Sequence, residues 1–343
     1  MIRKSSKNSE SGIAFIAVLL IIAVLAVIIL EFNYESRMKL HLADNFHLAS
    51  QALNCAEAGI AISMAALRQN SDILADEELS PFFSGMLQIP IEEDYCIISI
   101  VDESGKININ ALRTSGGQLV RHRVDQMLRL VDLLNYQYGE DSPFSYSLIP
   151  AMIDWVDPDD DVTYLSFVKR ENVGAENDHY QNLEDPYPCK NAPFDVLSEL
   201  LLVKGMTMEM FQGRAGNEST GIKPANGIQQ FLTVYGDGKI NINAASTTVI
   251  QSLSDRIDYT LAQNIVEHRR FSRYESIKQL QEVPGMTSEI YGDLRGSVTV
   301  RPQGRYYTVT VTGVVGQFVR KVQVVLRRDG HTAQVAAVLR REL

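Results

Sequence analysis

Cysteine is scarce in this 343-residue chain, and positive charge does not balance negative charge. The cysteines are Cys55, Cys96 and Cys189. They match no zinc-ligand spacing and are too few for a dense disulfide framework, and their odd number leaves at least one thiol unpaired or paired between chains. The net charge of −10 argues against nucleic acid as the main partner, since phosphate binding relies on Lys and Arg.

Signature motifs of enzymes are also missing from the sequence. It contains no G-x-S-x-G, no H-E-x-x-H, no Walker loop and no dinucleotide-binding glycine fingerprint. Its six histidines are scattered, without the spacing of a metal site or a catalytic triad. We therefore expect a protein that is not an enzyme.

Proline and glycine are nearly absent from the N-terminal part of the chain. The first proline is Pro81, and no glycine lies between Gly12 and Gly59. Because both residue types interrupt helices, their absence permits one continuous helix. The apolar run Ile13–Leu30 has 18 residues. As a helix it would extend about 27 Å, close to the ~30 Å hydrocarbon core of a bilayer.

The residues that flank this run predict its orientation in a membrane. Arg3, Lys4 and Lys7 precede it, and Glu31 and Glu35 follow it. Positively charged residues beside a membrane helix tend to stay in the cytoplasm. The N-terminus is therefore expected in the cytoplasm, and the bulk of the chain on the other side of the membrane. A secretory signal peptide is the main alternative, but its apolar region usually has only about 7–15 residues. A buried core helix is the other alternative.

Beyond the membrane run, apolar residues recur at alternating spacings of three and four. The stripe consists of Leu42, Phe46, Ala49, Leu53, Ala56, Ile60, Met64 and Leu67. This pattern predicts an amphipathic helix, which joins the membrane run into one rod on the order of 80 Å long. One face should pack on a soluble domain, and the expected partner-facing stem residues are Leu42, Phe46, Leu53 and Ile60. A membrane anchor followed by a separate helix is the alternative.

The N-terminal segment resembles the leader of type IV pilins and pseudopilins. A short basic stretch ends in Gly12, and the apolar helix starts at Ile13. The resemblance implies that a prepilin peptidase cuts after Gly12 and methylates Ile13. Members usually have Glu at the fifth position after the cut, where this chain has Ala17. A carboxylate in lipid is costly without the amine of the subunit ahead, so its absence fits a subunit at a filament tip.

A second feature is an internal repeat. Residues 101–111, VDESGKININA, recur as YGDGKININA at 235–244, and Val-x-Gly-Met-Thr follows at 203–207 and 283–287. The lysine precedes that glycine by 99 residues in the first copy and by 46 in the second. An internal duplication with an insertion of ~53 residues in the first copy explains both spacings.

The second copy resembles the helix-hairpin-helix module of DNA-uptake receptors, which binds the DNA backbone. The turn Pro284-Gly285-Met286 fits the pattern, whereas the first hairpin, residues 253–258, lacks the glycine. A small basic patch is formed by His268, Arg269, Arg270 and Arg273. In an acidic chain we interpret this patch as a solvated helix end, with DNA binding as the alternative.

The insertion contains the most densely acidic segment of the chain. Its motifs are DWVDPDDD at 154–161, GAENDHY at 174–180 and NAPFD at 191–195. With the two repeats and the missing Glu, they closely resemble protein K of the type II secretion system, a minor pseudopilin. The resemblance implies an inner-membrane protein with a periplasmic bulk, which acts at the pseudopilus tip in protein export with other minor pseudopilins as partners. A minor pilin of a type IV pilus is the alternative.

Four aspartates within five positions of this segment repel one another unless they are solvated or neutralised. Carboxylate oxygens suit Ca²⁺, and the resemblance also implies calcium in this lobe. The expected ligands are Asp157, Asp159, Asp161, Glu176 and Asp178. Asp154 is expected to be a structural residue on a helix, and Trp155, the only tryptophan, a core anchor. A solvated acidic loop is the alternative.

From residue 297 the chain is rich in β-branched residues. Strands are expected at 297–301, 306–312 and 318–326, with Gly313 and Gly316 in a hairpin turn and 94–101 as a partner strand. The tail from residue 331 is either a strand or a frayed helix, and a separate C-terminal β domain is the alternative.

Together these patterns predict an α+β fold: a long N-terminal transmembrane helix packed on a small antiparallel sheet, with an all-α lobe of two helix-hairpin-helix-like repeats inserted. The expected parts are a leader (1–12), a stem helix (13–68), the first part of a pilin-like head (69–105), the lobe (106–295, with repeats at 106–230 and 239–295) and the C-terminal head strands (296–343).

Overall fold

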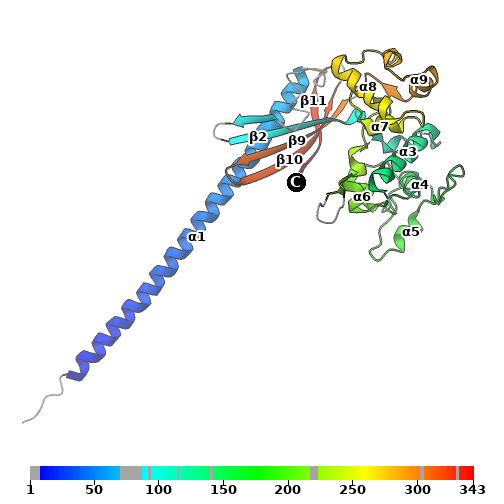
Figure 1. Cartoon of the computed structure of the whole chain (residues 1–343). Coiled ribbons are helices and arrows are strands. Elements are labelled where there is room, and N and C mark those ends of the chain that lie inside the picture. The colour runs from blue at the N-terminus through cyan, green and yellow to red at the C-terminus, as the bar shows by residue number, and fades with distance from the viewer. Residues whose placement is uncertain are drawn as a thin grey trace, which may run out of the picture.

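A computed structural model describes residues 8–69, 87–91, 94–114, 116–139, 142–216, 223–301, 305–329 and 332–343. One long helix, α1 (Asn8–Gln69), leaves the remainder of the molecule as a rod (Figure 1). A small sheet lies beside the C-terminal end of this helix, and a helical lobe lies beyond the sheet. This is the predicted α+β arrangement.

Helix α1 has 62 residues, and its first half is exposed to solvent throughout residues 14–47. By length and composition it is able to cross a membrane. It begins at Asn8 rather than at Ile13, and no proline lies between these positions to end it. Residues 1–7 of the expected leader lie outside the described residues.

The head is a five-stranded antiparallel sheet in the order β1-β2-β9-β10-β11. Its strands are β1 (Leu87–Ile91), β2 (Asp94–Asp102), β9 (Arg305–Val315), β10 (Phe318–Arg328) and β11 (Val335–Glu342). The alternating apolar residues of β2, β9 and β10 turn one face toward α1, where they bury Ala56 and Ile60. Arg328 Nε donates to the Leu67 carbonyl at 2.7 Å and holds the end of the helix against the sheet.

Several expectations for the head need correction. The segment 297–301 is not a head strand, because β8 (Val298–Thr299) pairs in parallel with β7 (Ile240–Asn241) inside the lobe. The lobe therefore extends past residue 295. Strand β1 was not predicted, since it is short and contains Pro90, and the tail forms the strand β11. Gly313 lies within β9, while Gly316, with a φ of +54°, forms the hairpin turn.

The lobe lies between β2 and β9 along the chain. Its α-helices are α3 (Arg121–Tyr138), α4 (Leu148–Asp154), α5 (Asn177–Gln181), α6 (Met208–Gln212), α7 (Thr247–Ser252), α8 (Tyr259–Phe271) and α9 (Ser288–Leu294). Its remaining short elements are the 3-10 helices η2 (Glu103–Gly105), η3 (Ile109–Ala111), η5 (Leu197–Leu202), η6 (Ile228–Gln230) and η7 (Ile277–Glu282), and the strands β3 (Ile107–Asn108), β4 (Gly213–Arg214), β5 (Ala225–Asn226) and β6 (Leu232–Thr233). One hydrophobic core runs through the lobe. Trp155 is buried in it, edge-on to Tyr180 and stacked near Phe194, as expected of an anchor.

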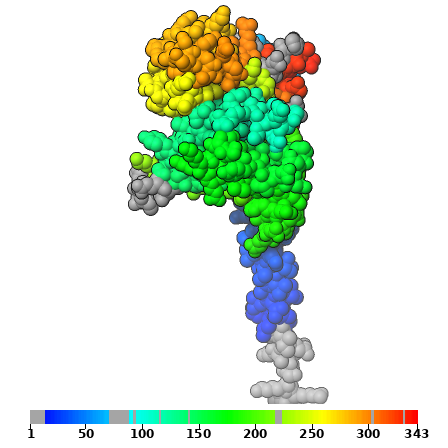
Figure 2. Space-filling view, turned by 90° about the vertical axis from the view of Figure 1, so that its right-hand side faces the viewer, coloured from blue at the N-terminus to red at the C-terminus, as the bar shows by residue number. Residues whose placement is uncertain are grey.

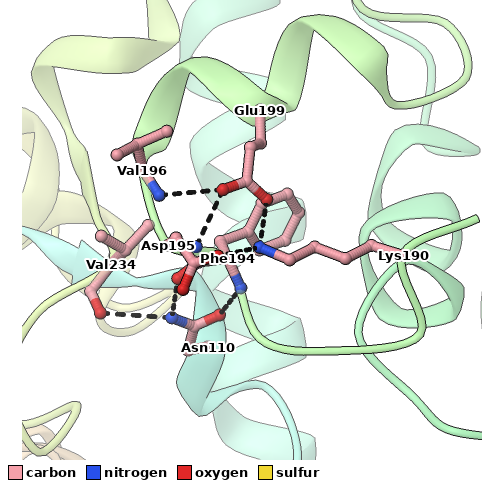
Figure 3. A network of polar contacts seen from close by, with 7 residues as sticks. All are labelled: Asn110, Lys190, Phe194, Asp195, Val196, Glu199 and Val234. Carbon is pink, nitrogen blue, oxygen red and sulfur yellow. Dashed lines mark hydrogen bonds and ion pairs between the residues drawn. The ribbon is translucent and has the colours of Figure 1, made fainter.

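The two repeats use the same hydrogen bonds. In the first, the Asn110 side chain accepts from the Phe194 amide at 2.8 Å and donates to the Phe194 carbonyl at 3.0 Å (Figure 3). In the second, Asn243 forms the same pair of bonds with Tyr274, at 3.0 and 2.9 Å. Each repeat also closes with a parallel pair of two-residue strands, β3 with β6 and β7 with β8.

The residues after these asparagine partners match as well. Glu199 Oε1 accepts from the amides of Asp195 and Val196, at the start of η5 (Figure 3). The carbonyl oxygen of the Gln279 side chain accepts from the two corresponding amides at the start of η7. The copies therefore share one fold, as the repeated sequence predicts. The first copy adds Lys190, which donates to both Asp195 and Glu199 at 2.7 Å.

Candidate functional site

Three buried carboxylates converge where the insertion packs on the first repeat. Asp154 ends α4, Asp157 lies in the turn after it, and Glu176 precedes α5. One oxygen from each lies within 4.8 Å of the others. The three residues are at most 3% exposed, so bulk water does not screen their charges. We refer to Asp154, Asp157 and Glu176 as the acidic cluster.

The hydrogen bonds of the acidic cluster are incomplete. The Thr163 amide donates to both carboxylate oxygens of Asp154, at 3.0 and 3.2 Å, and Arg113 forms an ion pair with Asp157 Oδ2. In contrast, Asp157 Oδ1 and both oxygens of Glu176 are buried without a partner among the described residues. Buried oxygens of this kind are costly unless a cation or a donor reaches them.

Burial and like charge act together on Glu176. Burial first, and then the charges of Asp154, Asp160 and Asp159, raise the pKa of its carboxyl group to about 7. With Glu176 ionised, three carboxylates and the Arg113 guanidinium leave two uncompensated negative charges in the cluster. That charge and the all-oxygen donor set fit a hard divalent cation such as Ca²⁺.

The structure groups the predicted ligands differently from the sequence pattern. It brings Asp157 and Glu176 together, and it adds Asp154, which we had expected to be structural only. Asp159, Asp161 and Asp178 are exposed, and Asp159 acts on Glu176 only as a nearby charge. The i, i+3 spacing of Asp154 and Asp157 could have indicated their common face, since residues three apart are neighbours on a helical turn.

The predicted stem residues divide into two groups. Leu42 and Phe46 are 69% and 75% exposed, beyond the reach of the head. Leu53 is partly buried and Ile60 is 7% exposed, and both contact the chain's own sheet. A role in partner binding remains a prediction for Leu42 and Phe46, whereas the structure assigns Ile60 to intramolecular packing.

The residues on either side of the predicted leader cleavage site are part of helix α1. Gly12 and Ile13 are both helical, close to the N-terminal end of α1. Cleavage after Gly12 and methylation of Ile13 stay predictions.

One cation of the basic patch in the second repeat is taken up by the protein itself, whereas Arg270 is exposed. Arg269 donates to the carbonyls of Ile242 and Ala245 at 2.7 Å, and burial lowers its pKa to about 10. The Asp258 carboxylate accepts from the Leu261 amide at 2.8 Å at the N-terminus of α8. A phosphate at this helix end would meet that carboxylate.

Comparison with known proteins follows the same division of the chain. Residues 105–213 match the family model of protein K of the type II secretion system, and residues 236–299 match that of the helix-hairpin-helix motif. The fold matches a chain in the crystal structure of the GspK-GspI-GspJ complex from the type 2 secretion system of enterotoxigenic Escherichia coli. The TM-score is 0.61 at 18% identity, over 86% of this chain and 96% of that chain. No curated protein matches. The predicted resemblance to protein K is confirmed.

Proposed function

We propose that this chain is a minor pseudopilin at the tip of a type II secretion pseudopilus, where it takes part in protein export across the outer membrane. The position of the lobe carries this proposal. The lobe is inserted between β2 and β9, at the far end of α1, and is much broader than the stem (Figure 2). Heads of this width would collide if they were stacked along a thin filament, so a single copy fits at its end.

The exposed half of α1 supports a membrane-stored protomer. Its apolar side chains are exposed throughout residues 14–47, which suits lipid before assembly and other helices after it. The basic residues Arg3, Lys4 and Lys7 favour a cytoplasmic N-terminus in the inner membrane, with the head and lobe in the periplasm. Prepilin peptidase would release Ile13 as the mature N-terminus. With Ala17 in place of Glu, the helix contains no carboxylate that requires a subunit ahead.

The partners follow from the exposed stem. The similar solved chain comes from a complex of GspK with GspI and GspJ. We propose that two other minor pseudopilins pack their own helices along the face of α1 that contains Leu42 and Phe46. In this role the chain is an assembly component and not an enzyme.

Site-specific photo-crosslinking tests this assignment. A photoreactive phenylalanine analogue at Phe46 of the full chain in membranes should crosslink to two smaller proteins that are synthesised with prepilin-type leaders. The same analogue at Ile60 is the matched control, because this position is covered by the head sheet and should give no intermolecular product. Crosslinks at Phe46 to further copies of this chain, or to none of the minor pseudopilins, would contradict the tip assignment.

We propose that a calcium ion binds the acidic cluster and stabilises this part of the lobe. Asp154, Asp157 and Glu176 would hold the ion, and bound calcium would supply the positive charge that three buried carboxylates lack. Asp154 ends α4, Asp157 follows it, and Glu176 directly precedes α5, so bound calcium would tie the end of α4 to the start of α5.

Duplex DNA binding is a second candidate function, because residues 236–299 match the helix-hairpin-helix motif. Such binding should weaken steeply with salt, since it would depend on phosphate contacts. Titration of the full chain in detergent with a fluorescent duplex at low and high salt separates the two candidates. Strong, salt-sensitive binding without crosslinks at Phe46 would favour DNA, and no binding at low salt would remove this candidate.

A further inference from the structure

Two of the three cysteines lie at the contact between the stem helix and the head. Cys55 is on α1 and Cys96 is on β2, and they are 5% and 0% exposed. Both belong to the hydrophobic core that joins the helix to the sheet. Their separation by 41 positions along the chain concealed this proximity at the level of sequence.

Two glycines bring the helix and the sheet unusually close at this point. Gly313 of β9 pairs directly with Cys96, and a Cβ atom at Gly313 would lie only 2.0 Å from the Ala52 carbonyl oxygen, just before Cys55 on α1. Gly59 lies one turn after Cys55, and a Cβ atom there would lie 3.0 Å from Cys96 Sγ. The Cys96 sulfur therefore points at α1, on the face that Cys55 shares with Gly59.

Contacts of the two thiols agree with this geometry. Burial, and after it the charge of Asp94, raise the pKa of the Cys55 thiol, while the backbone of Val314 lowers it; Val314 follows Gly313, the residue that pairs with Cys96. Burial, and after it the neighbouring Cys55, raise the pKa of the Cys96 thiol. Cys55 and Cys96 thus face each other across the joint between helix and sheet. Cys189 is remote, in the lobe, with its sulfur 3.7 Å from the Asp154 carbonyl oxygen.

We propose that Cys55 and Cys96 form a disulfide bond that clamps the stem helix to the head sheet. Each thiol loses its proton, a bond forms between the two Sγ atoms, and two electrons pass to a disulfide oxidant, whose S–S bond breaks to give two thiols. Glutathione disulfide and oxidised dithiol proteins are oxidants of this class. In cells this reaction rests on the proposed periplasmic location of the head, since the cytoplasm keeps thiols reduced.

The disulfide would strengthen the joint between α1 and the head sheet, which is under tension when the protomer is assembled. Lifting α1 out of a bilayer pulls on the helix, and the head must follow. Among the described residues, apolar packing, the hydrogen bond of Arg328 with the Leu67 carbonyl and the ion pair of Arg340 with Glu57 already join the two parts, and the disulfide would add a covalent link. A cross-link that closes a loop of about 40 residues also restricts the unfolded chain, which stabilises the folded head.

Thiol counting on the full chain tests the pairing. The reduced protein is diluted from denaturant into detergent with a buffer of oxidised and reduced glutathione, so that burial does not block the oxidant. It is then denatured and alkylated without reductant, and peptides are identified by mass spectrometry. All three cysteines are free thiols in the structure. After oxidation we expect one alkylated cysteine, Cys189, and a cross-linked pair of peptides containing Cys55 and Cys96, and after reduction three alkylated cysteines.

Variants make the result specific. Cys189→Ser should leave no alkylated cysteine and should melt several degrees higher when oxidised than when reduced. Cys55→Ser should leave two alkylated cysteines, Cys96 and Cys189. Three free thiols in the oxidising buffer, or a cross-link that contains Cys189, overturns the proposal.

The same count on protein taken directly from membranes separates this inference from the proposed function. A bond that forms in glutathione buffer but is missing in cells supports the pairing and counts against a periplasmic head. Free thiols in both samples, together with crosslinks from Phe46 to minor pseudopilins, leave the proposed function standing and overturn the disulfide.

Discussion

Gly313 of β9 touches the Ala52 carbonyl of the stem helix so closely that a Cβ atom at position 313 would lie 2.0 Å from that oxygen. The neighbouring atom is backbone in a long helix and cannot rotate away. Gly313→Ala should therefore push the head sheet off α1 and lower the free energy of unfolding by about 1–3 kcal/mol, as overpacked core substitutions do. Urea unfolding of the full chain in detergent measures the loss.

The matched control for this substitution is Gly292→Ala in α9. Nothing lies within 4 Å of a Cβ atom there, and alanine is the better helix former, so stability should be unchanged or rise by up to about 1 kcal/mol. If both variants unfold at the same urea concentration as the parent chain, the close contact at Gly313 is not present.

The asparagine bridges of the two repeats should be important for the lobe. Asn243→Ala removes both partners of the Tyr274 backbone, which is buried, and should cost about 1–3 kcal/mol. Asn110→Ala should have a similar effect in the first repeat. Asn226→Ala is the control, because Asn226 is exposed and, among the described residues, its side chain accepts one bond, from Gln230. Resistance of the lobe to proteolysis is the measurement. Equal resistance of Asn243→Ala and Asn226→Ala would contradict the prediction.

The acidic cluster should make calcium-free stability depend on pH. Burial and the charges of Asp154, Asp160 and Asp159 raise the pKa of Glu176 from 4.5 to about 7. The folded chain therefore binds this proton more tightly than the unfolded chain. Its contribution to stability is complete below about pH 4.5 and is lost as pH rises through about 7.

Glu176→Gln removes this titration and should stabilise the chelator-treated protein above pH 7 by on the order of 2 kcal/mol. Unfolding curves at a series of pH values provide the measurement. Asp178→Asn, at an exposed carboxylate close by, should keep the slope of the parent chain. A parent chain whose calcium-free stability does not change between pH 5 and 7 would rule out the raised pKa.

Calcium should reverse the effect of Glu176→Gln on stability. Added at about one hundred times its dissociation constant, the ion stabilises the parent chain by about 2.7 kcal/mol, since it binds only the folded form. Glu176→Gln should lose most of this gain, although it is the more stable variant without calcium. Asp161→Asn should keep the gain, because Asp161 lies outside the cluster. Thermal melting with and without calcium distinguishes these outcomes, and an equal loss in both variants would show that the ion binds elsewhere.

Local patterns in the sequence were sufficient for much of the fold. An apolar run and a stripe spaced by three and four predict α1, because helix periodicity depends only on near neighbours. The repeated Lys-Ile-Asn-Ile-Asn predicts two copies of one fold, and alternation predicts β2, β9 and β10. Glycine was harder to interpret, since Gly313 looks like a turn residue until the helix that it touches is in place.

The sequence by itself determined the stem helix, the head strands β2, β9 and β10, the internal repeat and the resemblance to protein K, because these depend on residue types and short spacings. Only the tertiary structure decided which distant groups meet. It brought Asp154 together with Asp157 and Glu176, left Asp159, Asp161 and Asp178 exposed, moved β8 from the head into the lobe, and placed Cys55 and Cys96 in one core. The physical reason is that such contacts are set by how a helix packs on a sheet and how a turn buries its carboxylates, which no short stretch of sequence encodes.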